Sequence, residues 1–372
     1  MSIENKRTKT LLPGIDPEVK IHGRCRVQNP LPVFWTAGGI EVLTDSTELN
    51  IGVSTDYDLY EQWIRIEVDG FNMIRMMLPR GRSTIGVFRG MKPGIKRRVR
   101  LFREVQPMFD DENAILLIES VSGDGEFYPV PDRRYKIEFV GDSITSGEGL
   151  SGSRSFHEWN AVSFSTIGSY TELTADKLDA DYRIISQSGW GVYCGWDNNP
   201  HNTVPKIYGQ YCSVINGKYA DKFYTHEEYD FTGWRPDAVV INLATNDEGS
   251  FNNAAWTDPD TGISYKQDMN DNGVSTGRFT QAVSDLIMQV RRYNKDSHIV
   301  WAYGVLSDKL RPYIEEAIDR YRKISGDERI SYVSLPGLKS SWIGANEHPG
   351  RPAHEAAADV LSNELEKILS GK

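Results

Sequence analysis

The hydrophobic pattern of this chain changes its period at a Pro-rich junction, Pro129 to Pro131. Before the junction, apolar and polar residues alternate, as at 64–68 and 115–121, with Gly-containing turns between the runs. This period of two indicates short antiparallel strands joined by tight turns. Many short strands of this kind usually close as a sandwich or jelly roll. We therefore predict an N-terminal β-sandwich domain, jelly-roll-like, over residues 1–130.

After the junction, predicted strands and helices alternate along the chain. The strands are 135–140, 182–186, 238–243, 299–303 and 330–335, and the helices are 166–178, 279–293, 313–324 and 352–369. The run 238–243 is almost continuously apolar, as is typical of parallel strands buried on both faces. The alternation predicts an α/β domain over 131–372, with a parallel sheet flanked by helices. Two domains also suit a chain of 372 residues, since single cores stop growing at roughly 250–300 residues.

Composition excludes several classes of protein. The chain has 42 Lys and Arg against 52 Asp and Glu, a net charge of −10, which argues against nucleic acid or an anionic membrane as a partner. Hydrophobic residues make up 39%, enough to form cores. The three cysteines are odd in number and form no CxxC, so neither a disulfide framework nor a thiolate metal site is expected. Residues 1–7 lack the apolar run of a signal peptide, which predicts a cytoplasmic protein, or a secreted one whose leader has been removed.

Polar clusters follow three of the predicted parallel strands. They are Gly141-Asp142-Ser143, Ser188-Gly189-Trp190-Gly191 and Ala244-Thr245-Asn246-Asp247. A fourth cluster, 346–350, contains His348 and precedes the last helix. Ligands of open α/β sheets bind beyond the carboxyl ends of the strands. We therefore expect these clusters to form one site.

These motifs resemble those of the SGNH (GDSL) hydrolases. Gly141-Asp142-Ser143 is similar to the nucleophile block, 244–247 to the Gly-x-Asn-Asp block with Ala in place of Gly, and His348-Pro349 to the final His block. Gly191 falls where the family's oxyanion Gly lies. All four occur in the family's order over the C-terminal two thirds of the chain. With a β-rich domain ahead of them, they look most like carbohydrate esterase family 2, whose members remove acetyl groups from xylan and related sugars.

The resemblance implies a three-layer α/β/α sheet and a Ser–His mechanism without a metal or cofactor. Ser143 would be the nucleophile and form an acyl-enzyme, and His348 would take its proton and later donate it to the sugar. The backbone N–H groups of Ser143 and Gly191 and the side-chain amide of Asn246 would bind the developing oxyanion.

For two of these roles, the sequence offers a second candidate residue. Gly189 competes with Gly191 for the oxyanion hole, and His354 on the last helix competes with His348 as the base. Asp142 and Asp247 fit better as residues that hold loops by hydrogen bonds than as chemical participants.

The residue that orients His348 is not the usual one. The superfamily usually has an Asp three residues before this His, and here that position is Ala345. Members of carbohydrate esterase family 2 often use a backbone carbonyl instead. We therefore predict that a carbonyl within 345–347 accepts from the His348 ring, with the side chains of Asn346 and Glu347 as alternatives.

Four aromatic residues flank the motifs, namely Trp190, Tyr193, Trp196 and Trp342. One or two of them could stack on sugar rings, and core packing is the alternative for each.

An acidic segment, 268–279, resembles the start of an EF-hand loop. Phe279 stands where the twelfth ligand, Glu, would be required. We therefore interpret it as a surface loop and predict no metal site.

The leading functional hypothesis is a carbohydrate O-deacetylase acting on acetylated oligosaccharides or polysaccharides. A GDSL-type lipase or thioesterase is an alternative, but it needs an apolar acyl channel, and the motif loops are polar and aromatic. A carbohydrate-binding protein with a vestigial site is a third, and intact Ser143, Asn246 and His348 argue against it. The sequence is compatible with a homo-oligomer and does not identify the sugar.

Overall fold

The computed structural model of the chain describes residues 8–371, and the chain divides into two compact units. Unit 1 comprises Met1–Asp132, Asn160–Val162 and Gln210–Tyr229, and unit 2 comprises the remainder. The hydrophobic pattern did not indicate that two later segments belong to unit 1. The division of roles between 1–130 and 131–372 stays a prediction, and the expected lack of a signal peptide concerns residues 1–7, which lie outside the described residues.

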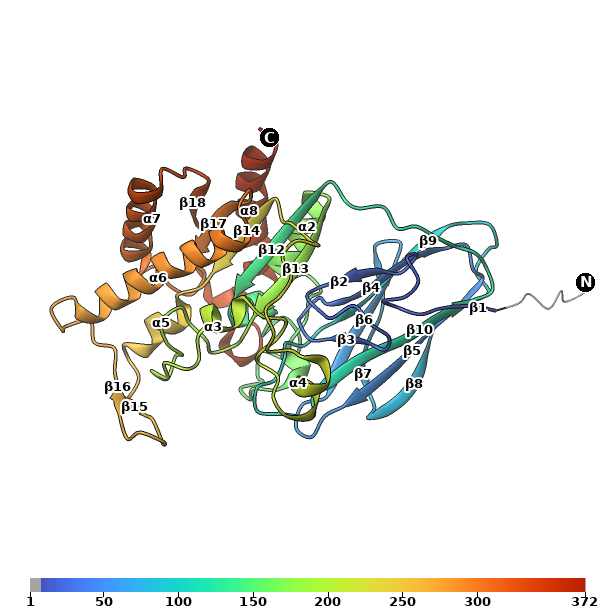
Figure 1. Cartoon of the computed structure of the whole chain (residues 1–372), viewed down its shortest axis with the longest axis horizontal. Helices are drawn as coiled ribbons and strands as arrows, with labels where there is room; N and C mark the ends of the chain where they lie inside the picture. Colours follow the sequence, from blue (N-terminus) through green and yellow to red (C-terminus); the bar gives the residue numbers. More distant parts are fainter. Residues whose placement is uncertain (1–7, 372) are drawn as a thin grey trace, which may run out of the picture. The chain divides into compact units, whose positions relative to one another are not determined.

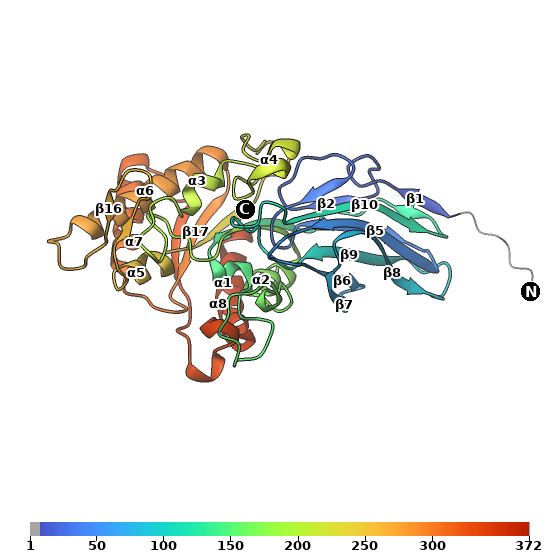
Figure 2. The same ribbon diagram turned by 90° about the horizontal axis from the view of Figure 1, so that it is seen from below.

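Unit 1 contains two sheets in which every strand pairing is antiparallel. The first has the order β1-β10-β5-β8, and β3 also pairs with β10. Its strands are β1 Lys9–Leu11, β3 Leu31–Val33, β5 Glu48–Asp56, β8 Gly81–Arg89 and β10 Ile115–Gly123. In β5 every second residue is buried, including Leu49, Ile51 and Val53, because successive side chains of a strand point to opposite faces. Figure 2 shows these long strands running alongside one another.

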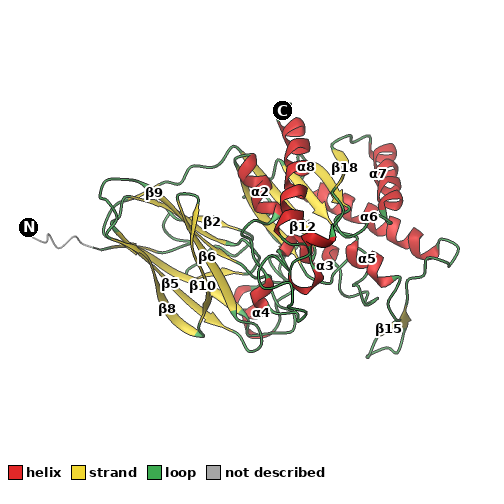
Figure 3. Ribbon diagram, turned by 180° about the vertical axis from the view of Figure 1, so that it is seen from behind, coloured by secondary structure: helices red, strands yellow, loops and turns green. Residues whose placement is uncertain are grey.

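The second sheet has the order β11-β4-β9-β6-β7, and β2 also pairs with β4. Its strands are β2 Lys20–His22, β4 Gly39–Thr44, β6 Gln62–Val68, β7 Phe71–Leu78, β9 Arg97–Arg103 and β11 Phe127–Tyr128. The predicted antiparallel strands of the N-terminal half are therefore present, and their jelly-roll arrangement stays a prediction. Strands dominate this unit, which also contains the short helix α4, Gly217–Phe223 (Figure 3).

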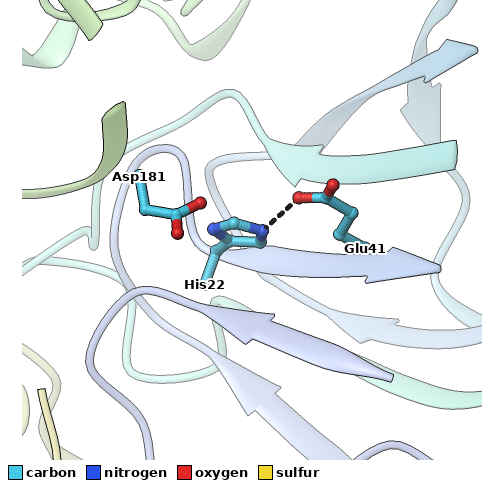
Figure 4. Close-up of side chains that lie close together, drawn as sticks. All are labelled: His22, Glu41 and Asp181. Atoms are coloured by element: carbon cyan, nitrogen blue, oxygen red, sulfur yellow. Dashed lines mark hydrogen bonds and ion pairs between the residues drawn. The ribbon is translucent and has the colours of Figure 1, made fainter. Parts of the chain in front are cut away.

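A buried hydrogen bond links two strands of the second sheet. His22 Nε2 lies 2.9 Å from Glu41 Oε2, as Figure 4 shows, and both side chains are buried. Burial alone would raise the pKa of Glu41, but the hydrogen bond to His22 and the charges of Arg98 and Arg100 lower it to about 2. A buried carboxylate is therefore held ionised by the partners around it.

Unit 2 is built on a fully parallel sheet with the order β13-β12-β14-β17-β18. The strands are β12 Tyr135–Gly141, β13 Ala180–Ser186, β14 Ala238–Asn242, β17 His298–Tyr303 and β18 Ile330–Ser334. Their central residues are buried on both faces, as the apolar run in β14 predicts. The predicted α/β fold with a parallel sheet is thus confirmed, and each predicted strand lies within two residues of its observed bounds.

Helices cover both faces of this sheet. Figures 1 and 3 show α2 and α8 together on one side of the strands and α6 and α7 on the other. The four helices are α2 Tyr170–Lys177, α6 Val274–Tyr293, α7 Arg311–Ser325 and α8 Arg351–Leu369. The shorter elements of unit 2 are α1 Ser143–Ser146, α3 Val204–Tyr208, α5 Thr245–Ser250, the 3-10 turns Ser340–Trp342 and Ala345–Glu347, and the hairpin β15 Trp256–Thr257 with β16 Ser264–Tyr265. A further 3-10 turn, Ala161–Ser163, has its first two residues in unit 1.

Helix starts differ most from the sequence prediction, and capping explains the difference. The hydroxyl of Ser169 accepts a hydrogen bond from the Glu172 N–H, so α2 begins at Tyr170 instead of residue 166. Asp271 accepts from the N–H and the hydroxyl of Ser275 and lies just before α6. The acidic loop at 268–279 therefore uses Asp271 to start a helix, and Phe279 is a buried core residue of α6.

The strand order fixes where a site can form. Connections from β12 lead to β13 on one side, and the chain later returns to β14 on the other side. Such a switch point leaves a crevice at the carboxyl ends of the two diverging connections. The residues after β12, β13 and β14 are the three predicted polar clusters.

None of the helices within residues 8–371 combines the length and apolar character needed to cross a bilayer.

A buried ion pair between two strands of the parallel sheet leads to a prediction about the stability of unit 2. Arg183 of β13 forms an ion pair with Glu138 of β12, Tyr208 donates to Glu138 at 2.6 Å, and the Arg183 guanidinium lies 4.2 Å from the centre of the Trp234 ring. We predict that Arg183→Met lowers the free energy of unfolding by about 3–5 kcal/mol, because it leaves a buried carboxylate without its counter-ion. Replacing both charges, with Glu138→Leu added, should recover part of that loss in thermal or urea unfolding. A single-variant loss below about 1 kcal/mol would contradict this account.

Candidate active site

Ser143 occupies the first position of a short helix that starts directly after β12. β12 ends at Gly141, and Asp142 caps α1 by accepting from the Ile144 N–H at 3.1 Å. A Cβ on Gly141 would lie 1.9 Å from Thr145 Oγ1, so only glycine fits where the strand meets the helix. The Gly-Asp-Ser order therefore has a local physical reason, which is a tight, capped strand-to-helix turn that fixes the serine.

His348 lies next to Ser143 and is held from its far side. Its Nε2 is 2.9 Å from Ser143 Oγ, and its Nδ1 is 2.7 Å from the carbonyl oxygen of Asn346. The carbonyl can only accept, so Nδ1 carries the proton and Nε2 is the acceptor for the serine hydroxyl. This tautomer is the one a general base requires.

The backbone before His348 is held in an unusual conformation. Asn346 and Glu347 both have positive φ, 49° and 57°, which turns the Asn346 carbonyl back toward the imidazole. Gly149 packs against this turn, and a Cβ there would lie 2.5 Å from His348 Cβ. The loop is further held by hydrogen bonds from Ala345 N to Gly149 O, at 3.1 Å, and from Asn346 N to Phe156 O, at 2.6 Å.

The acceptor of the His348 proton is a backbone carbonyl, within the range 345–347 expected from the sequence. The two rival side chains point elsewhere. Asn346 donates its side-chain amide to Glu148 Oε1 at 2.8 Å, and the Glu347 side chain is exposed.

Three candidate N–H donors lie in the segments that follow β12, β13 and β14, and one of them differs from the sequence prediction. Within residues 8–371, the backbone N–H groups of Ser143 and Gly189 have no hydrogen-bond partner. Asn246 donates one of its two amide hydrogens to Trp190 O at 3.0 Å, and the second hydrogen is available to another acceptor. Gly191, the predicted oxyanion residue, instead donates its N–H to Asn202 O at 3.3 Å. The bridge it forms with Thr203 also ties it into its own loop.

Asp247 holds the loop that carries these glycines. Its carboxylate accepts from the N–H groups of Val192, Tyr193 and Cys194, at 2.8, 2.7 and 3.2 Å. Burial raises the pKa of Asp247 to about 6, and the three backbone hydrogen bonds oppose that rise. Asp247 therefore has the loop-holding position that the sequence favoured.

Ala244 stands where the Gly-x-Asn-Asp block has its glycine, and its backbone has a positive φ that favours glycine. Its φ is 115°, in the region that side chains with a Cβ rarely adopt, and it is fully buried at the end of β14. The strand therefore turns into α5 at a strained residue, and this turn directs Asn246 and Asp247 toward the site.

His354, the rival base, is a buried residue of α8. Its Nδ1 accepts from the Tyr170 N–H at 3.1 Å, and its ring stacks on the Tyr170 ring. Burial lowers the pKa of His354 to about 4, so this ring is neutral near pH 7. Its contacts make it a link between α2 and α8.

The four aromatic candidates have different environments. Trp190 is only 8% exposed and packs in the core, whereas Trp196 is 53% exposed. A Cβ on Gly189 would lie 3.1 Å from Trp196 Cδ1, so this exposed ring borders the loop at Gly189. Tyr193 and Trp342 are half-buried, and the amine of Lys339 lies 4.2 Å from the centre of the Trp342 ring.

Sequence reasoning missed two residues of the site, Glu148 and Gly149. Glu148 is 2% exposed and accepts from Asn346 and, at 2.8 Å, from the Ser188 hydroxyl. The only signal was the Gly-Glu-Gly run directly after the nucleophile block. Two glycines around a charged residue normally indicate an exposed turn, and here the turn folds inward.

The fold and the Ser–His pair define an ester hydrolase of the SGNH type, and comparison with known proteins agrees. The chain is 37% identical to an acetyl xylan esterase from the rumen bacterium Butyrivibrio proteoclasticus, with a TM-score of 0.95 over 98% of this chain and 99% of that one. The chain belongs to the family 2 carbohydrate esterases.

More distant relatives share the fold. A family two carbohydrate esterase from Clostridium thermocellum, solved with cellohexaose, is 24% identical with a TM-score of 0.78, over 95% of this chain and 99% of that one. The cellulase/esterase CelE of Acetivibrio thermocellus is 27% identical over 367 residues, which are 95% of this chain and 40% of that protein. The chain thus spans less than half of that relative. No model of a known protein family matches the chain.

Asp142, the cap of α1, gives a pH-dependent prediction. Burial, together with the nearby charges of Asp247 and Glu148, raises the pKa of Asp142 to about 7. The folded state therefore binds this proton more tightly than the unfolded chain, and ionised Asp142 reduces stability as pH rises from about 4 to 7. We predict that Asp142→Asn removes this penalty, so the variant's stability relative to wild type increases by at least ~1 kcal/mol between pH 4 and pH 8.

Thermal unfolding of both proteins across this pH range measures the difference. Any loss from the altered cap is independent of pH and cancels in the comparison. A constant difference at both pH values would show that the pKa of Asp142 is not raised in the folded protein.

Proposed function

We propose that this protein removes acetyl groups from acetylated xylan or xylo-oligosaccharides by a Ser–His mechanism. The observation that carries the proposal is the pair of contacts on His348, 2.9 Å to Ser143 Oγ and 2.7 Å to the Asn346 carbonyl. The names of the similar proteins, acetyl xylan esterase and acetylxylan esterase / glucomannan deacetylase, support the substrate class.

In the proposed reaction, Ser143 Oγ attacks the acetyl carbonyl carbon while its proton passes to His348 Nε2. The resulting imidazolium then donates that proton to the sugar oxygen as the ester bond breaks, which leaves an acetyl-enzyme. A water molecule then attacks the acetyl carbonyl carbon while it gives a proton to His348 Nε2. The bond between the acetyl carbon and Ser143 Oγ breaks, and acetate leaves the site. Ser143 recovers its proton from the imidazolium.

We propose that the oxyanion is bound by the N–H groups of Ser143 and Gly189 and by the second amide hydrogen of Asn246. This assignment replaces Gly191, whose N–H is bonded to Asn202. Donors fixed in advance stabilise the developing charge without reorganisation, and each is typically worth about 10²–10³ in rate. Asp247, through its hold on Val192, Tyr193 and Cys194, keeps that loop in place.

The exposed ring of Trp196 beside Gly189 is our candidate for stacking on the sugar. A neutral sugar suits an acidic protein with net charge −10 better than a polyanion does. The jelly-roll form of the N-terminal domain, over residues 1–130, and the assignment of catalysis to 131–372 belong to the same proposal.

The nucleophile is tested by Ser143→Ala. The variant should fold normally and lose at least about a thousandfold in kcat for acetate release from acetylated xylo-oligosaccharides, because no acyl-enzyme can form. Ser153→Ala is the matched control, since Ser153 is an exposed hydroxyl in the loop that follows the site. Turnover by Ser143→Ala close to that of the wild type would contradict the mechanism, and undetectable wild-type turnover would favour a vestigial binding site.

The acyl specificity separates a deacetylase from a lipase or thioesterase. We predict that kcat/KM for a chromogenic acetate ester exceeds that for the octanoate by at least about a hundredfold, because polar and aromatic loops surround the nucleophile. Each well-buried methylene would add about 0.8 kcal/mol of binding in an apolar acyl channel. A preference for octanoate would therefore favour the lipase alternative.

A further inference from the structure

Glu148 is a buried carboxylate beside the catalytic histidine. It follows Gly147, the left-handed residue that ends α1, and its N–H donates to the Ser143 carbonyl at 3.0 Å. The position is thus fixed by the same helix that carries the nucleophile. Its Oε1 lies 3.6 Å from His348 Nδ1. This distance is too long for a hydrogen bond, but it is short enough for a strong attraction between a carboxylate and an imidazolium.

Both oxygens of Glu148 accept hydrogen bonds. Oε1 accepts from the Asn346 side-chain amide at 2.8 Å, and Oε2 accepts from the Ser188 hydroxyl at 2.8 Å. A carboxyl group that receives donors on both oxygens is in the pattern of an ionised carboxylate. The negative charge therefore faces the side of the imidazole opposite Ser143.

We propose that Glu148 is a positioning residue that does the work of the missing triad carboxylate through two separate contacts. Its hydrogen bond with the Asn346 amide fixes the residue whose carbonyl orients His348. Its charge, without a direct hydrogen bond to the ring, stabilises the imidazolium that forms when Ser143 gives up its proton. The proposal rests on the Ser–His mechanism above.

This arrangement separates two functions that one aspartate usually combines. In a Ser-His-Asp triad the carboxylate both selects the tautomer and stabilises the imidazolium. Here the tautomer is selected by the neutral Asn346 carbonyl, so removing the Glu148 charge should leave the correct tautomer in place. The loss should therefore be smaller than the roughly 10⁴-fold loss that follows when the tautomer is wrong.

Other titratable groups on the elements around His348 could also change the pH dependence of the reaction. They are Asp142 before α1, Asp247 on α5, Glu347 next to His348, and His354, Arg351 and Glu355 on α8. Arg351 and Glu355 pair with each other at 2.8 Å, and His354 is neutral near pH 7. Glu347 is exposed, so solvent screens its charge.

The test is Glu148→Gln, which keeps the shape and removes the charge. We expect kcat to fall by about 10- to 100-fold with little change in KM, since the loss concerns the imidazolium of the transition state. The acidic limb of the kcat/KM profile should move to lower pH by about one unit, because an imidazole without its anion is protonated less readily. Glu148→Asp, which keeps the charge, should retain the acidic limb of the wild type.

Two controls separate charge from structure. Glu347→Gln removes a charge at an exposed position between Asn346 and His348 and should shift the acidic limb far less than Glu148→Gln. Ser188→Ala removes the Oε2 partner without removing charge and should leave the limb in place. Thermal unfolding of each variant verifies that the protein is folded.

A loss of kcat in Glu148→Gln with an unshifted acidic limb would overturn the electrostatic role, and wild-type kinetics would overturn the whole proposal. Ser143→Ala is assayed in parallel. If that variant is inactive and Glu148→Gln behaves as the wild type, only the Glu148 proposal fails. If Ser143→Ala is active, the Ser–His mechanism itself fails.

Discussion

The hydrogen bond from His348 Nδ1 to the Asn346 carbonyl is the contact on which the rest of the site depends. A carbonyl cannot move as a side chain does, so the backbone itself must be bent to present it. Two successive residues with positive φ and a glycine pressed against His348 Cβ provide that bend. The strain is of the kind that persists only where neighbouring structure fixes it. The hydrogen bonds of Ala345 and Asn346 to the loop after α1 do so.

The parallel sheet brings these pieces together because β12, the first of its strands along the chain, lies at the switch point. β12 delivers Ser143, β13 leads to Gly189, and β14 leads to Asn246 and Asp247. Each loop is then held by a polar group under it, since Asp142 caps α1 and Asp247 binds three backbone N–H groups. Three buried carboxylates, those of Asp142, Asp247 and Glu148, thus lie under the site. Their proximity contributes to the raised pKa of Asp142.

Much of this could be predicted from the sequence because it depends on local patterns. The strands of the sheet follow from continuous apolar runs, and the order of the motif blocks places Ser143 and His348 at one edge. The direction of the Gly191 N–H could not be predicted, because it depends on a bond to Asn202 eleven residues later. Glu148 was missed for a similar reason, since its partners Ser188 and Asn346 are distant in the sequence. The inclusion of 210–229 in unit 1 is likewise decided by tertiary contacts and not by hydrophobic period.

The central claim is that Ser143 carries the acetyl group during turnover. Acid quenching of the enzyme while it hydrolyses a chromogenic acetate ester, followed by mass spectrometry of the digested protein, tests it directly. The account predicts one acetyl group on the peptide that contains Ser143, formed at the rate of the initial burst and absent from the Ser143→Ala protein. Steady turnover with no acetylated peptide, or with the acetyl group on another residue, would contradict it.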